Sequence, residues 1–92
     1  MTNMTSKALP PSVWTPLHAA VADGESFGVA NNNGTDVVTV RVGQTATAND
    51  AANAGSVDIP PRDDKSFVGL KTGDLSFGRP LGNTTVFVTL WE

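Results

Sequence analysis

His18 carries the only imidazole of the chain, so no other side chain could act as the histidine base of a serine hydrolase. That mechanism requires a nucleophile, a base and an orienting carboxylate within reach of one another. His18 lies between Leu17 and Ala19, and no nucleophile motif adjoins it. Single histidines without a partnered nucleophile rarely perform chemistry, which favours a plain residue at the surface or at the edge of the core.

The acidic residues give no stronger indication of chemistry. Asp63 and Asp64 are adjacent, but Arg62 and Lys65 flank and would neutralise them, and calcium-loop spacing is absent. A glycosidase needs two carboxylates in a deep cleft, for which 92 residues offer little room. Cysteine ligands for zinc are lacking. We therefore predict that the protein is not an enzyme and has no catalytic, cofactor-binding or metal-binding residues.

Size and composition favour a single domain that is stabilised by association with partner subunits. A chain of 92 residues forms one small core, which is marginal without disulfides, metals or oligomerisation. Because the chain has no cysteine and one histidine, a homo-oligomer is the expected solution.

The charge pattern argues against two classes of partner. The net charge is −3, and the six Lys and Arg residues are scattered along the chain. Proteins that bind nucleic acid or an anionic membrane surface gather such residues on one face, so neither partner is expected. No apolar run could span a bilayer, and the first residues lack the apolar stretch of a signal peptide. Synthesis in a cytoplasm, without export by that route, is therefore expected.

Alternating apolar residues predict that the elements of the fold are β-strands. Two stretches fifty residues apart, SFGVANNNGTDVVTVRV (26–42) and SFGRPLGNTTVFVTLWE (76–92), share Ser-Phe-Gly, an Asn at the expected turn and a Val-Thr pair. Each has the residues of a strand, a turn and a return strand. We interpret the similarity as two hairpins in one sandwich rather than as a true duplication.

Six or seven short strands separated by Gly, Pro and Asn turns predict an all-β fold, either a small antiparallel β-sandwich or a jelly-roll-like barrel. Residues 17–24 could form one turn of helix or a further extended strand. The last strand carries bulk on both faces, so it should be central or covered on its second face. The expected core consists of Phe27, Val29, Val38, Val40, Val42, Val57, Ile59, Phe67, Leu70, Phe77, Val86, Val88 and Leu90.

Two segments are expected to lie outside this core. Pro10-Pro11 favours extended backbone, so residues 1–13 are predicted to form an extended N-terminal arm on a single sandwich domain of residues 14–92. Residues 44–56 contain no large apolar side chain and predict an exposed loop. The hypothesis is that arm and loop become ordered only in an assembly.

The two tryptophans lie near the chain ends, where such residues commonly pin a terminus to the core or to a neighbouring subunit. A stacking platform for a sugar ring is the alternative. The candidate interface residues are Val13, Trp14, Leu17, Phe87 and Trp91.

The order of these segments resembles a known type of protein. Val13-Trp14 is followed by ADGESFGVANNNGTDVVTVRVG, an Ala- and Asn-rich loop, GSVDIPP and a terminal TVFVTLWE. This order is similar to that of the small all-β accessory virion proteins of tailed bacteriophages, which include capsid decoration (cement) proteins and related domains of head fibres and necks. The resemblance covers roughly residues 14–92 and lies in composition and order of elements, so no functional residue is carried over.

The resemblance implies a non-enzymatic structural protein of the virion, made in the host cytoplasm. Such a protein binds the outer surface of a phage capsid and stabilises it through protein–protein contacts, typically as a trimer. The expected partners are copies of the chain itself and the major capsid protein or another virion protein. The alternatives are a glycan- or receptor-binding domain of a phage fibre, and a structural component of the neck or tail.

Overall fold

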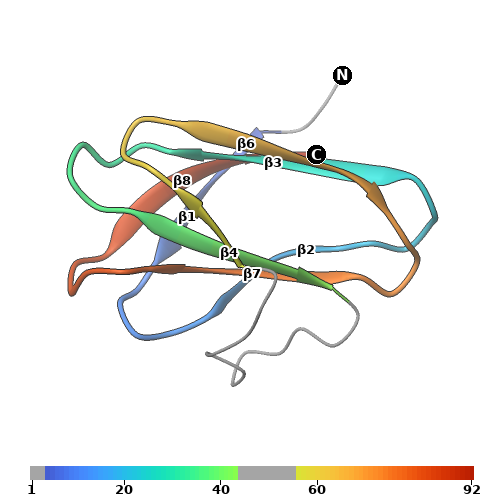
Figure 1. Cartoon of the computed structure of the whole chain (residues 1–92), viewed down its shortest axis with the longest axis horizontal. Helices are drawn as coiled ribbons and strands as arrows, with labels where there is room; N and C mark the ends of the chain where they lie inside the picture. Colours follow the sequence, from blue (N-terminus) through green and yellow to red (C-terminus); the bar gives the residue numbers. More distant parts are fainter. Residues whose placement is uncertain (1–3, 44–55) are drawn as a thin grey trace.

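The computed structural model describes residues 4–43 and 56–92, whose regular structure consists entirely of β-strands (Figure 1). Within these two ranges no helix is long and apolar enough to cross a membrane. The eight strands are β1 (Met4–Leu9), β2 (Thr15–Ala19), β3 (Glu25–Asn31), β4 (Val38–Gly43), β5 (Ser56–Ile59), β6 (Asp64–Leu70), β7 (Leu75–Pro80) and β8 (Val86–Trp91).

The strands form two four-stranded antiparallel sheets that pack face to face as a sandwich (Figure 1). Sheet A has the order β1-β8-β3-β6, and sheet B has the order β2-β7-β4-β5. Eight strands in this order form a jelly roll. The predicted all-β sandwich is therefore confirmed, and β8 is a central strand of sheet A, as expected from its two bulky faces.

The two predicted hairpins are wrong in their pairing, although the strand bounds are close to those expected. β3 and β4 lie in different sheets, and so do β7 and β8. The chain between β3 and β4 spans residues 32–37 and crosses from one layer to the other, which a two-residue hairpin turn could not do. Asn33 shapes this crossing, since its Oδ1 accepts hydrogen bonds from the backbone N–H groups of Thr35 (2.7 Å) and Asp36 (2.9 Å).

The repeated stretches belong instead to a two-fold repeat of a four-strand unit. Replacing each strand of sheet A by the strand four places away in the chain gives β5-β4-β7-β2. This is the order of sheet B, β2-β7-β4-β5, read in the opposite direction. Leu9-Pro10-Pro11 at the end of β1 corresponds to Ile59-Pro60-Pro61 at the end of β5, again fifty residues later. Ser12 and Arg62, which follow these prolines, both have left-handed backbone, with φ of 64° and 61°.

The extended N-terminal arm is not confirmed. Residues 4–9 of the predicted arm form β1, which pairs with β8 in register from Met4↔Trp91 to Leu9↔Val86, and Leu9 is fully buried. The predicted loop at 44–56 lies outside the described residues except for Ser56, which begins β5. For residues 17–24 the structure selects the extended alternative, because β2 ends at Ala19 and a turn follows.

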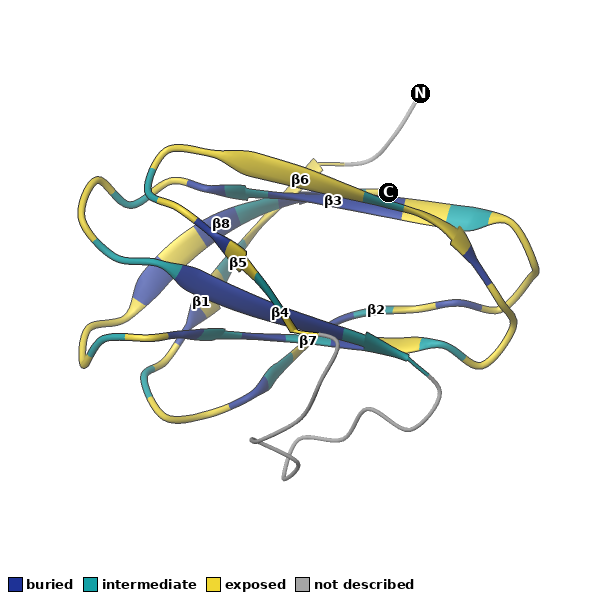
Figure 2. Ribbon diagram, in the orientation of Figure 1, coloured by how far each residue is buried: buried dark blue, intermediate teal, exposed yellow. Residues whose placement is uncertain are grey.

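The hydrophobic core lies between the two sheets, and β4 is the strand most completely buried (Figure 2). Nine of the expected residues are buried there: Phe27, Val29, Val38, Val40, Ile59, Leu70, Val86, Val88 and Leu90. Val42 and Phe67 pack against the core while partly exposed, and Val57 and Phe77 are half-buried. Leu9 and Ala20 belong to the core without having been expected there.

Every strand pairing joins one half of the chain to the other, because β1–β4 pair only with β5–β8. A chain cut between Gly43 and Ser56 should therefore give two fragments that are unstructured alone, since neither can form a sheet. An equimolar mixture should regain the β-sheet circular dichroism of the intact protein. A stable β-structure in either fragment alone would contradict this pairing.

Candidate interaction surface

The five residues of the predicted interface do not lie on one surface. Trp14 and Leu17 are each only 5% exposed, so they are buried inside the folded domain and a partner cannot reach them. Val13 and Phe87 are exposed, and Trp91 is half-buried. Of these residues the structure brings together Phe87 and Trp91, which lie on the same side of β8.

Register defines the side of sheet A that faces away from the core. Val86, Val88 and Leu90 of β8 point into the core, so the alternate residues of this strand point outward. Residues directly opposite one another in antiparallel strands share a face of the sheet, which adds the partners from β1 and β3. We call the part of this surface on β1, β8 and β3 the outer face; it comprises Met4, Ser6, Ala8, Gly28, Ala30, Phe87, Thr89 and Trp91. The edge strand β6 borders the outer face with Ser66 and Asp64, which lie opposite Gly28 and Ala30.

The outer face carries no charge at any of these positions, and it exposes two large apolar side chains. Met4 is 68% exposed and Phe87 is 57% exposed, and small residues surround them. When one face of an antiparallel sheet is in solvent, its polar residues ordinarily alternate along each strand with the apolar residues of the buried face. An uncharged three-stranded face with two aromatic residues on its middle strand, β8, is instead typical of a surface that another molecule covers.

Trp91 is held on the outer face by a close approach to β3. A Cβ atom at Gly28 would lie 2.0 Å from Cε2 of Trp91, so the indole lies directly against the backbone at Gly28 and leaves no room for a side chain. Beside it, Nδ2 of Asn32 donates a hydrogen bond of 2.8 Å to Oγ1 of Thr89. The face therefore has a fixed aromatic group, an amide and a hydroxyl next to one another.

The corresponding side of sheet B is covered within the chain. Thr39 and Arg41 of β4 are the counterparts of Thr89 and Trp91 at the fifty-residue offset, yet they are 6% and 1% exposed. The Trp14 ring lies near both Arg41 (Cζ 5.3 Å from the ring centroid) and Arg79 (4.8 Å). Trp14 thus packs over sheet B, whereas Phe87 and Met4 on sheet A remain exposed.

His18 contacts two carboxylates rather than a nucleophile. Its Nδ1 lies 2.7 Å from Oε2 of Glu92, and its Nε2 lies 2.9 Å from Oε1 of Glu25. The Oγ of Ser76 donates to the backbone oxygen of His18 at 2.9 Å and does not approach the ring. Sequence reasoning missed this cluster, because Glu92 is 74 residues away along the chain and no local pattern links the two.

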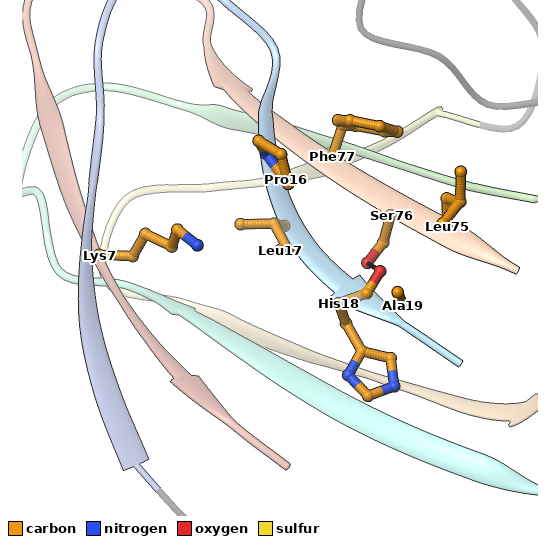
Figure 3. A pocket seen from close by; sticks show the side chains of 8 residues that line it. All are labelled: Lys7, Pro16, Leu17, His18, Ala19, Leu75, Ser76 and Phe77. Carbon is orange, nitrogen blue, oxygen red and sulfur yellow. Dashed lines mark hydrogen bonds between the residues drawn. The ribbon is translucent and has the colours of Figure 1, made fainter. Parts of the chain in front are cut away.

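An open hollow of about 180 Å³ lies beside His18, between the edge strands β1 and β2 (Figure 3). Its lining residues are Lys7, Pro16, Leu17, His18, Ala19, Leu75, Ser76 and Phe77. Lys7 is the partner of buried Val88 in the register, so it points inward from an edge strand. Inward charges of this kind prevent edge-to-edge association of sheets, which explains Lys7 without a ligand.

No group of three potential metal ligands occurs among residues 4–43 and 56–92. The two carboxylates at His18 approach opposite ring nitrogens and so do not converge on one point. Comparison of the chain with family models, curated proteins and solved structures finds no match.

Asp23 and Glu25, which lie next to the turn between β2 and β3, make the stability of the fold depend on pH. The backbone N–H and the hydroxyl of Thr72 donate to Oδ1 of Asp23 and hold the pKa of that carboxyl below its ordinary 3.8. The backbone N–H of Val21 donates to Glu25 and, together with His18, holds the Glu25 pKa below its ordinary 4.5. Both groups favour their charged form in the folded state.

A lowered pKa contributes stability above the unfolded value, and this contribution is lost as pH falls through the folded value. The melting temperature should therefore decrease as pH falls below about 4.5, where the unfolded chain begins to bind more protons than the folded one. Asp23→Asn should make this decrease shallower than in the unmodified protein. Thr72→Val removes only the hydroxyl donor, so its decrease should be intermediate between those of the unmodified protein and Asp23→Asn. Equal slopes for all three proteins in calorimetry would contradict the assignment.

Proposed function

We propose that the chain is a non-enzymatic structural protein of a phage virion, of the capsid decoration type, and that it docks through the outer face of sheet A. The observation that carries this proposal is the uncharged outer face with exposed Phe87 and Met4. Aromatic residues and Met are enriched, and charged residues depleted, at the centres of protein–protein interfaces. A protein surface is thus the partner that this composition favours.

The size of the face favours binding by several copies together. The three strands of the outer face, spaced about 4.8 Å apart and with about six residues of 3.3 Å each, give a flat area of roughly 300 Å². A stable interface of standard size buries about 800 Å² on each partner. One copy would therefore bind weakly through this face, and a homo-oligomer, a trimer by the resemblance, would gain strength from simultaneous contacts.

The jelly-roll architecture is compatible with this proposal. Jelly rolls occur in viral capsid proteins, and also in lectins and cupins. The same fold hosts unrelated functions, so the argument depends on the surface and not on the strand order. The proposed partners are the major capsid protein, or another virion protein, and copies of this chain.

A second candidate function is the binding of a neutral glycan, and the geometry of Trp91 favours it. The indole lies against β3 at Gly28, on the same face as the amide–hydroxyl pair of Asn32 and Thr89. Aromatic rings stack on the apolar faces of sugars, while amides and hydroxyls pair with sugar hydroxyls. Because Trp14 is buried, Trp91 is the tryptophan that such a ligand would contact.

A charge placed on the outer face tests the docking proposal. Phe87→Asp and Ala8→Asp should each weaken cosedimentation with capsid shells of the parent phage by tenfold or more, because a desolvated unpaired charge opposes association. Val21→Asp is the matched control, since Val21 is 80% exposed and lies outside the outer face. Circular dichroism would establish that each variant is folded.

Undiminished cosedimentation of both outer-face variants would overturn the docking proposal. A glycan array supplies the competing result. Binding of a neutral oligosaccharide that is lost in Trp91→Ala and kept in Val21→Asp would favour the glycan function instead.

A further inference from the structure

The His18 cluster joins three strands at one edge of the sandwich. His18 lies in β2 of sheet B, Glu25 begins β3 of sheet A, and Glu92 directly follows β8 of sheet A. The two contacts, of 2.9 Å to Glu25 and 2.7 Å to Glu92, therefore connect the two sheets. No backbone pairing connects β2 to sheet A, so this connection depends on side chains.

The two short contacts fit one protonation state of the ring better than the others. A neutral imidazole has one N–H donor and one nitrogen lone pair, whereas the imidazolium has two donors. A lone pair that faced a carboxylate oxygen at less than 3 Å would repel it. Because both ring nitrogens lie at hydrogen-bond distance from carboxylate oxygens, the arrangement fits the doubly protonated ring with two ionised glutamates.

The ring is fixed in position by its other contacts. It stacks on Phe27 at 5.1 Å between centroids, and Phe27 stacks in turn on Phe67 at 4.9 Å. The side chain of His18 is 11% exposed. Across the hollow the charged group is Lys7 of β1, while the neighbours from β7 are uncharged (Figure 3). Two carboxylates thus contact the ring, and one ammonium lines the hollow beside His18.

The contact to Glu92 bears on the outer face, because Glu92 is the neighbour of Trp91 along the chain. We propose that His18 is a charge-dependent clasp, which in its doubly protonated form fastens the end of β8 to β2 and keeps Trp91 seated on Gly28. Loss of one ring proton as pH rises leaves a single donor, so one carboxylate is released. This clasp is independent of the docking proposal, since it concerns the isolated chain.

Nuclear magnetic resonance on the unmodified protein tests the clasp, because one histidine gives one set of ring signals. In the doubly protonated form, both ring nitrogens should show attached protons. As the ring loses a proton at higher pH, the indole signal of Trp91 should shift in step with it. The exchange protection of the last amides of β8 should fall by about tenfold over the same range.

Glu92→Gln separates the clasp from an unrelated pH effect. In this variant the ring should still titrate, but the indole signal of Trp91 and the amide protection should no longer follow it. Asp64→Asn, which removes an exposed carboxylate from edge strand β6, should keep the coupling. A Trp91 signal that does not change with the protonation of the ring in the unmodified protein would overturn the proposal.

Discussion

The fold depends on one constraint. The strands in each half of the chain find their hydrogen-bonding partners only among the strands of the other half. β3 pairs with β6 and β8, and β4 pairs with β5 and β7, so every ladder of hydrogen bonds crosses between the halves. Unpaired backbone groups buried in the core would cost more than such a small domain can offset. Without disulfides, the chain therefore acquires sheets and core in one step, and the two four-strand units form a single domain.

The two outer sides of the sandwich differ because the two halves carry different residues at one equivalent position. The halves have matching strand orders, yet the turn after β1 brings Trp14 over sheet B, beside Arg41 and Arg79. At the equivalent place in the second half the chain carries Asp64, which is exposed on the edge strand of sheet A. Sheet B is consequently covered by its own chain, and sheet A presents Phe87 without such a cover.

Much of the fold could be predicted from local pattern, because apolar alternation determines which residues form strands and which face inward. The partner of each strand could not be predicted in this way. The residues between β3 and β4 are typical of a tight hairpin turn, and no local feature of the sequence indicates a crossing between sheets. β1 was missed because its apolar residue in the core, Leu9, stands at its end, and Trp14 and Leu17 were assigned to an interface from their place in the chain alone. The His18 contacts depend on the completed sandwich, so sequence spacing carries no sign of them.

Docking through the outer face of sheet A requires that this face becomes buried when the protein assembles. Hydroxyl-radical footprinting of the protein, free and bound to its assembly partner, measures this directly. Met4, Phe87 and Trp91 should lose reactivity on assembly, while Val21 and Leu81, which are exposed apolar residues elsewhere, should keep theirs. Protection of Val21 and Leu81 with unchanged reactivity at Met4 and Phe87 would contradict the account and place the contact on another side of the molecule.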